Sequence, residues 1–406
     1  MNTKFAILAT LTFTLVACHG LQTASKDGSN PSLNYSKVLA QGQPSLERVS
    51  ISQWPDFGEA WEQRDLFLRD SLDNSIEWFE APSSRQWFPM EEISHTKAKN
   101  SVTAIRRLLE TSSTKEQFLS ELEARFDVYR SVGCDDEGTV LFTGYYAPDF
   151  YASKFPTPEN KSALHTRPWE LVVDPTSGEP LGRKLQDGSV VPWPSRREIV
   201  TSGMFDGNEL VWVRDDLDAY TIHVNGSARL RLEDGELMYI GYAGKTDRPY
   251  TGLGKSVLDA GLLQPSALSL RNIRRLYDRN PDQIKDLMYN NESYVFFKEY
   301  DGASWPAGSL GVQVTPRRSI ATDKRIYPRG GIVLVDTTVK SLTGEETMFT
   351  QFMVDQDTGG AIRAPGRADL YMGVGPTAGI KAGNQYAEGF LYYIFLKSDA
   401  VAVAQH

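Results

Sequence analysis

Hydrophobic residues recur at helical spacing between about Trp54 and Arg130. Apolar side chains there are three, four or seven positions apart, as on one face of a helix. The longest such run comprises Phe57, Trp61, Leu68, Leu72, Ile76 and Phe79. Shorter runs follow around Ile105 and Phe118, and Ser113 with Glu116 has the spacing of a capping box. This part of the chain is therefore predicted to be helical.

After Gly138 the pattern changes to short apolar runs separated by turn residues, which is typical of strands. The runs read VLFTGYY, LVWV, YTIHV, LMYIGYAG, YVFF, GIVLV and MFTQFMV. Residues 256–289 interrupt them with two helical stretches, SVLDAGLL and SLRNIRRLYDRN. We therefore expect a mainly β fold with an N-terminal helical region and without a repeat of fixed period.

The first eighteen residues have the features of an export signal. Lys4 precedes an apolar run from Phe5 to Ala17 that is too short to span a bilayer and fits a signal peptide. The run ends in Leu-Val-Ala-Cys, which resembles a bacterial lipobox, whose cysteine becomes the acylated first residue. Two or more acyl chains on Cys18 would hold the protein stably on a membrane. An ordinary signal peptide with a chance cysteine is the alternative.

His19 follows the cysteine, where the inner-membrane retention signal of enteric lipoproteins would place Asp. We therefore expect a lipid-anchored protein on the periplasmic face of the outer membrane. Residues 19–43 are rich in Ser, Asn, Gln and Gly and predict a flexible tether. Cys134 then lacks a disulfide partner in the chain, and we interpret it as a small buried hydrophobic residue.

Composition and motifs exclude several kinds of chemistry. The net charge of −9 argues against a nucleic-acid partner, because counterion release needs a basic face. The five histidines are scattered without zinc-site spacing, and no G-x-S-x-G elbow is present. GYAGKT lacks the first glycine of a phosphate loop, and no βαβ unit follows GVGPTAG. No metal or cofactor is expected, and carboxylates remain as the candidate reactive groups.

Two aspartates stand out near the C-terminus. Asp357 and Asp369 lie in QDTGGAIRAPGRADLYMGVG, with three glycines and a proline between them. A buried strand does not normally contain that mixture, and a solvated loop does not normally place apolar residues beside each acid. We interpret the stretch as two carboxylates held on glycine-rich backbone, which can approach a ligand closely.

Six segments, in this order, resemble those of the lytic murein transglycosylase A family. They are FTGYYAP at 142–148, VNGSARLRLEDG at 224–235, YAGKTDRPYTGLGK at 242–255, NESYVFF at 291–297, SIATDKRIYPRG at 319–330, and the aspartate stretch itself. The resemblance implies a double-psi β-barrel split in sequence, at 44–147 plus 291–406. A smaller β-rich domain would be inserted at 148–290, and the cleft between the two would hold a peptidoglycan glycan strand.

The implied reaction cleaves the β-1,4 bond between N-acetylmuramic acid and N-acetylglucosamine without water. The 6-hydroxyl of the muramic acid attacks its own anomeric carbon and closes a 1,6-anhydro ring, so one carboxyl group can first donate and then accept a proton. The family motif assigns this role to Asp369, and a desolvated setting with a raised pKa would suit it. Asp357 would orient or tune it, or stabilise a turn. Asp323, the third aspartate of the family's 3D region, is either functional or caps a turn before Pro328.

The resemblance also implies residues that contact the glycan. They are Thr143, Tyr145, Tyr146, Gly226, Ser227, Tyr242, Gly244, Gly359, Gly360 and Arg363. Core packing is the alternative for the tyrosines. Arg363 and Arg367 would meet substrate carboxylates or remain solvated.

One segment departs from the family, which usually carries Asp before V-Q-G-S-G. Here that position is His223, and Asn225 and Ala228 replace Gln and the second Gly. We predict that His223 packs or makes a polar contact and does not supply catalysis. Two other functions stay open at this stage: a conventional glycoside hydrolase on the same barrel, and a non-catalytic lipoprotein that binds the cell wall.

Overall fold

The computed structural model describes residues 33–175, 178–264, 267–360 and 362–397. Cys18, the signal peptide and most of the tether therefore lie outside the described residues. Across the described ranges, no helix is both long and apolar enough to cross a membrane.

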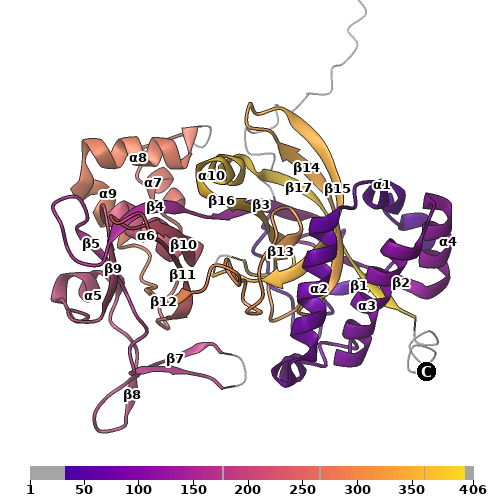
Figure 1. Cartoon of the computed structure of the whole chain (residues 1–406), viewed down its shortest axis with the longest axis horizontal. Helices are drawn as coiled ribbons and strands as arrows, with labels where there is room; N and C mark the ends of the chain where they lie inside the picture. Colours follow the sequence, from indigo (N-terminus) through magenta and orange to yellow (C-terminus); the bar gives the residue numbers. More distant parts are fainter. Residues whose placement is uncertain (1–32, 176–177, 265–266, 361, 398–406) are drawn as a thin grey trace, which may run out of the picture.

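The predicted N-terminal helices are present and gather at one end of the molecule (Figure 1). They are α1 (Phe57–Glu62), α2 (Leu66–Glu80), α3 (His95–Thr111) and α4 (Lys115–Arg125), with 3-10 turns at Ile51–Gln53 and Pro82–Trp87. The cap of α4 is Thr114, whose side chain accepts a hydrogen bond from the backbone of Gln117. The expected box of Ser113 and Glu116 is therefore displaced by one residue.

A mixed eight-stranded sheet forms the centre of the fold. Its order is β1 (Leu46–Arg48), β2 (Phe126–Ser131), β17 (Tyr386–Leu396), β14 (Ile332–Lys340), β15 (Glu346–Asp357), β13 (Ser319–Ala321), β16 (Arg367–Val374) and β3 (Val140–Ala147). Because β17 also pairs with β3, the strands from β17 to β3 close into a ring. Two pairs, β13 with β15 and β16 with β3, are parallel.

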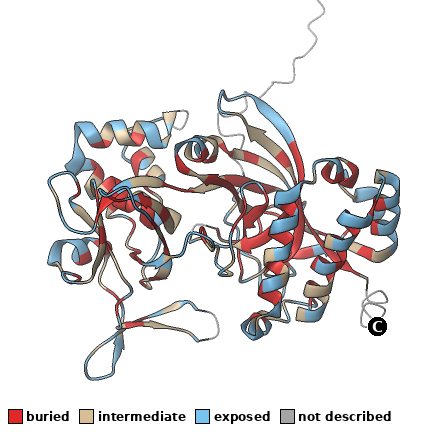
Figure 2. Ribbon diagram, in the orientation of Figure 1, coloured by how far each residue is buried: buried red, intermediate tan, exposed pale blue. Residues whose placement is uncertain are grey.

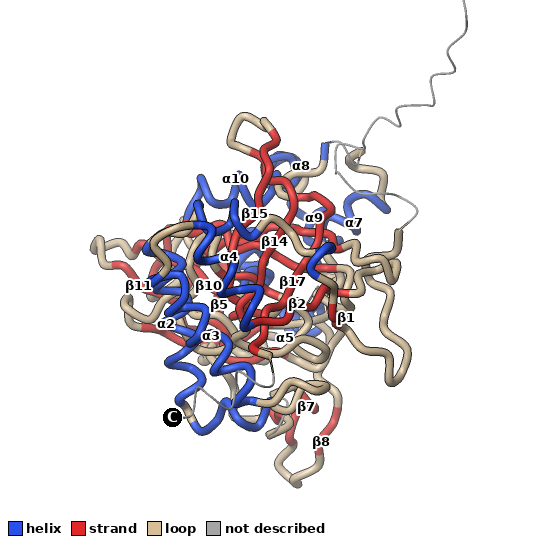
Figure 3. The backbone as a smooth tube through the Cα atoms, turned by 90° about the vertical axis from the view of Figure 1, so that its right-hand side faces the viewer, coloured by secondary structure: helices blue, strands red, loops and turns tan. Residues whose placement is uncertain are grey.

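The helices and the ring share one hydrophobic core. Helices α1 and α2 pack on β15, and α3 packs on β17. Figure 3 shows α2, α3 and α4 on the side of the molecule that faces the viewer, in front of the central strands. Phe352 of β15 contacts Phe57 and Phe118, with ring centroids 5.9 Å and 6.0 Å apart. Burial in Figure 2 is accordingly concentrated along the central strands and on the inner faces of these helices.

A second sheet lies at the other end of the molecule (Figure 1). Its order is β12 (Val295–Tyr300), β11 (Leu237–Lys245), β10 (Ser227–Arg231), β4 (Asp149–Ser153), β9 (Glu209–Val213) and β5 (Ser162–His165). The same half contains α5 (Arg196–Ser202), α6 (Asp216–Asn225), α7 (Leu253–Asp259), α8 (Leu270–Arg279) and α9 (Pro281–Met288). A small projecting sheet consists of β6 (Leu171–Val173), β7 (Pro180–Lys184) and β8 (Val190–Val191).

Two features of this half differ from the sequence expectation. The run YTIHV, which reads as a strand, lies in helix α6. Asp215 caps that helix by accepting bonds from Leu217 and Asp218, and Gly226 ends it at φ +73°, so the local end signals outweigh the β-branched residues. Strand β12, expected with the barrel, pairs with β11 of the second sheet.

Candidate active site

The register of the ring places both C-terminal aspartates in one row. Ala321 of β13 pairs with Asp357 of β15 on one side and with Asp369 of β16 on the other, and Asp369 also pairs with Thr143 of β3. Residues that pair directly point to the same face of a sheet. Since neighbouring strands lie about 4.8 Å apart, the two aspartate Cα atoms are about 10 Å apart. The row therefore runs Asp357, Ala321, Asp369, Thr143.

A bulge brings Asp357 into this row. Ile320 pairs with Asp355 and the next residue, Ala321, pairs with Asp357, so Gln356 is one extra residue in β15. The Gln356 side chain is bound by Ser71 and Ser319 at 3.0 Å and 2.6 Å. The bulge is thus held by buried polar contacts.

Asp369 and Asp357 are both partly exposed, whereas Asp323 is fully buried. The Asp369 side chain is 15% exposed, the Thr143 hydroxyl donates a hydrogen bond to it, and Nε of Arg367 lies 3.6 Å away. Ala368 and Leu370, its sequence neighbours, are buried in the core. They alternate to the opposite face of the strand, so they do not surround the carboxylate as the sequence suggests.

Asp357 ends β15 and is held by the backbone. Its carboxylate accepts bonds from the N–H groups of Ser309 and Thr358, both at 2.8 Å. Burial raises its pKa, while those two bonds, the Tyr145 hydroxyl and the charge of Lys324 act in the opposite direction without cancelling the effect.

Two tyrosines flank these acids. The rings of Tyr145 and Tyr371 pair across β3 and β16 with centroids 5.1 Å apart. The Tyr371 hydroxyl is buried without a hydrogen-bond partner among the described residues, whereas the Tyr145 hydroxyl faces the Asp357 carboxylate. Burial and the charge of Asp357 raise the pKa of both phenols, so they remain neutral donors at physiological pH. Unpaired buried donors are costly and mark places where a ligand can bind.

Asp323 has a different position. It is fully buried, and its carboxylate accepts bonds from the Arg325 backbone and guanidinium and from the N–H of Ala364. Burial acts to raise its pKa, but Arg325 and the Ala364 N–H outweigh it and hold the pKa below its usual range. Asp323 thus ties the loop between β15 and β16 to the end of β13, outside the row of acids.

The predicted glycan-contact residues fall into two groups. Thr143 and Tyr145 lie with the acids, and Gly360 faces Tyr250 of the second half, since a Cβ at Gly360 would lie 3.9 Å from that ring. A guanidinium nitrogen of Arg363 lies 3.9 Å from a carboxylate oxygen of Glu179. Gly359 is in the same loop as Gly360.

The other members of the set lie away from the acids. Tyr146 packs on Gly379 of α10 (Gly375–Asn384). Gly226 ends α6, Ser227 begins β10, and Gly244 forms a bulge in β11. Tyr242 is half exposed and lines a hollow on the second sheet.

Tyr250 was not singled out by the sequence. Burial is the main cause of its raised pKa, and the charges of Arg367 and Asp369 also act on its hydroxyl. It therefore stands near Asp369, on the opposite half of the molecule. The only sequence signal was its place within YAGKTDRPYTGLGK.

His223 is buried, as expected. Its Nδ1 accepts the N–H of Val295 at 3.1 Å, and its ring meets that of Tyr294 edge-on at 4.5 Å. Burial and the charge of Arg196 hold its pKa well below the usual value, so the ring is neutral. Cys134 is likewise buried with a free thiol. Within the described ranges, no three His, Cys, Asp or Glu side chains gather as a metal site.

Comparison with known proteins adds independent evidence. Residues 141–298 match the MltA specific insert domain, and residues 318–394 match the 3D domain. Membrane-bound lytic murein transglycosylase A of Vibrio cholerae is 30% identical over 272 residues, covering 66% of this chain and 68% of that protein. The Escherichia coli protein of the same name is 30% identical over 266 residues, covering 64% and 67%.

Solved structures agree on the fold. A membrane-bound lytic murein transglycosylase from Agrobacterium tumefaciens is 25% identical, with a TM-score of 0.69 over 89% of this chain and 99% of its own. E. coli MltA with bound chitohexaose is 22% identical, with a TM-score of 0.66 over 91% and 98%. Given these matches, this chain belongs to the membrane-bound lytic murein transglycosylase A family.

Proposed function

We propose that this lytic transglycosylase cleaves the β-1,4 bond between N-acetylmuramic acid and N-acetylglucosamine, with Asp369 as the only proton donor and acceptor. The observation that supports this assignment is the difference among the three carboxylates. Those of Asp357 and Asp323 accept backbone N–H groups, whereas Asp369 accepts none and is bound by a single hydroxyl, that of Thr143.

The proposed reaction needs one carboxyl group in two successive roles. Protonated Asp369 gives its proton to the glycosidic oxygen, and the bond from the muramic acid C1 to that oxygen breaks. The 6-hydroxyl of the same sugar then bonds to C1 and passes its proton to the Asp369 carboxylate, which restores the acid. The nucleophile is part of the substrate, so its effective molarity is high, up to about 10⁵–10⁸ M in well-oriented cases.

The surrounding residues position that carboxyl group and the sugar. The Thr143 hydroxyl fixes one carboxylate oxygen, leaving the other to face the substrate. The unpaired hydroxyl of Tyr371 is suited to bind a sugar hydroxyl. Asp357 is proposed as an orienting residue, because burial and its bonds to backbone N–H groups keep it fixed at the end of β15.

The glycan strand is proposed to lie where the two halves of the molecule face each other, between Tyr250 and the loop of Gly359 and Gly360. The E. coli structure with bound chitohexaose supports a glycan as the ligand. We further propose that the ring of strands belongs to a double-psi barrel domain formed by 44–147 and 291–406, with 148–290 as the inserted domain, to whose sheet β12 is added. The closed ring with two parallel strand pairs supports that reading.

Membrane attachment is proposed to occur through a lipid on Cys18, facing the periplasm from the outer membrane. Related proteins are named membrane-bound, which supports attachment.

Mass spectrometry of the products tests the proposed reaction. Purified sacculi digested with the protein should release muropeptides whose muramic acid ends are lighter by one water than hydrolysed ends. Products carrying a free reducing end in place of the anhydro ring would reject the mechanism and support a hydrolase.

A further inference from the structure

A cavity of about 210 Å³ lies inside the second half of the molecule, away from the row of acids. It is enclosed by β5, β9, α5, α6 and the end of α9. Its walls combine cationic, aromatic and imidazole groups, chiefly Arg196, His165, His223, Tyr220, Tyr289 and Tyr294.

Arg196 is the central feature of this cavity. It is 5% exposed, and its guanidinium donates to the carbonyl groups of Asn291 and Ser293. The same group lies 5.1 Å and 5.2 Å from the ring centroids of Tyr220 and Tyr294. Arg196 makes no ion pair with any residue that the structure describes. A buried guanidinium without a counter-charge is costly, even when carbonyl groups and rings offset part of the loss.

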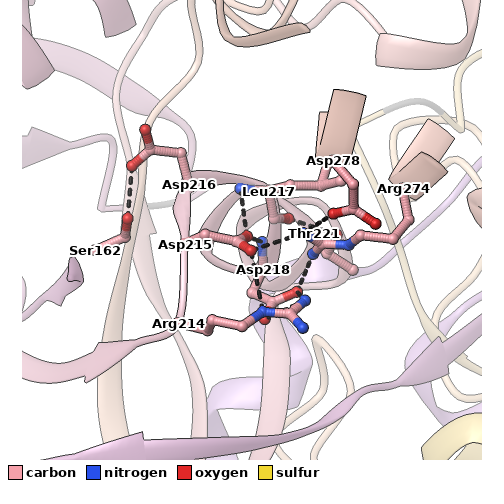
Figure 4. A network of polar contacts seen from close by, with 9 residues as sticks. All are labelled: Ser162, Arg214, Asp215, Asp216, Leu217, Asp218, Thr221, Arg274 and Asp278. Carbon is pink, nitrogen blue, oxygen red and sulfur yellow. Dashed lines mark hydrogen bonds and ion pairs between the residues drawn. The ribbon is translucent and has the colours of Figure 1, made fainter. Parts of the chain in front are cut away.

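The carboxylates near this cavity are engaged elsewhere. Asp216 accepts a hydrogen bond from the Ser162 hydroxyl at 2.6 Å, and its other carboxylate oxygen forms an ion pair with the Lys285 ammonium at 2.6 Å. Figure 4 shows its neighbours Asp215 and Asp218 directed at two other arginines. Helix α6 and its cap therefore carry three acids, and none of them forms an ion pair with Arg196.

Two further acids line the cavity at a different place. The charges of Asp206 and Glu209 act on His165. The cavity thus combines the guanidinium of Arg196 with carboxylates near His165 and tyrosine rings in its wall, while Lys285, which also lines it, is paired with Asp216. That distribution matches a small molecule with a carboxylate at one end and an ammonium at the other.

We propose that this cavity binds a small amino acid through its α-carboxylate, which pairs with Arg196. Arginine binds carboxylates with two parallel hydrogen bonds, so the free edge of the guanidinium suits this group. The ammonium lies toward Asp206 and Glu209, and a short side chain packs on the tyrosines. A peptide C-terminus offers the same carboxylate without the ammonium, and the experiment separates these two sources.

Calorimetric titration of the full chain tests the proposal with three ligands. Alanine should bind saturably and raise the melting temperature, while alaninamide, which lacks the carboxylate, should bind at least tenfold more weakly. N-acetylalanine binding as tightly as alanine assigns the site to a peptide end, and weaker binding assigns it to the free amino acid. Equal binding of alanine and alaninamide, or no saturable binding of either carboxylate, would overturn the proposal.

Two variants test the position of the ligand. His223 packs on the same Tyr294 ring as the guanidinium, so H223D supplies an internal carboxylate. It should bind alanine at least tenfold more weakly and melt higher without ligand. A163L leaves Arg196 in place and fills the cavity with an apolar side chain, and it should also abolish binding. Unchanged affinity in either folded variant would place the ligand elsewhere and reject the site.

Discussion

Replacing Asp323 with Asn tests whether this aspartate holds the loop between β15 and β16. The carboxylate accepts the Ala364 N–H at 2.9 Å and the Arg325 Nε at 2.9 Å. These two donors bind opposite oxygens of the carboxylate, and Asn replaces one of those oxygens with an NH2 group, so one donor loses its acceptor. A buried N–H without an acceptor costs about 1–3 kcal/mol. The Arg325 side chain is 53% exposed, so losing its ion pair adds only about 0–1 kcal/mol.

The expected loss is therefore about 1–4 kcal/mol in the free energy of unfolding at neutral pH. Urea denaturation followed by circular dichroism measures it. The difference in stability between wild type and D323N should shrink in acid, because the folded pKa of Asp323 is lowered. A carboxyl group with a lowered folded pKa contributes stability that is present above its unfolded pKa and is lost as the pH falls through the folded value.

The matched control is D301N, which alters an exposed turn aspartate bound by Ala303 and Ser304. It should shift the urea midpoint much less than D323N. An Asp323 variant as stable as wild type at neutral pH, or a difference that stays constant as the pH is lowered below the range where Asp titrates, would refute a structural role for this carboxylate.

Three more outcomes are expected. H223A should keep most of its activity on sacculi while losing about 1–3 kcal/mol in urea melts, because the Val295 N–H loses its acceptor; a hundredfold fall in rate for the folded variant would give His223 a catalytic role. C18A should leave the membrane fraction and fail to label with palmitate, and continued labelling would disprove the anchor. Asp357 should contribute a pH dependence of the free energy of unfolding with the opposite sign to that of Asp323, and D357N should remove it. A raised folded pKa contributes stability that is lost as the pH rises through it, so wild type should lose stability relative to D357N over that rise; parallel melting curves across that range would contradict it.

Helices and strands with strong periodicity could be predicted from the sequence. The run from Phe57 to Phe79 and the apolar run of β14 both form the expected elements, because apolar spacing alone decides which face is buried. YTIHV could not be predicted in this way. Its β-branched residues favour a strand, and only the capping Asp215 and the terminal Gly226 indicate the helix that forms.

The sequence predicted which residues belong to the candidate site but not how they are arranged. Asp369 lies in a paired strand and not on glycine-rich loop backbone, and its row with Asp357 depends on the bulge at Gln356. Register across non-consecutive strands is set by tertiary packing, which no local pattern reveals. Tyr250 was missed for the same reason, since it reaches the acids from the other half of the chain.

The central claim is that Asp369 alone transfers protons, and initial rates on purified sacculi for D369N and D357N test it most directly. Thermal melts of both variants confirm folding. Loss of a general acid typically costs about 10²–10⁴ in rate, and one residue serves both proton transfers here, so D369N should fall at the upper end of that range or beyond. D357N should lose less, because it orients and does not react. A D369N variant that keeps more than about a tenth of the wild-type rate, beside an inactive D357N, would contradict the account.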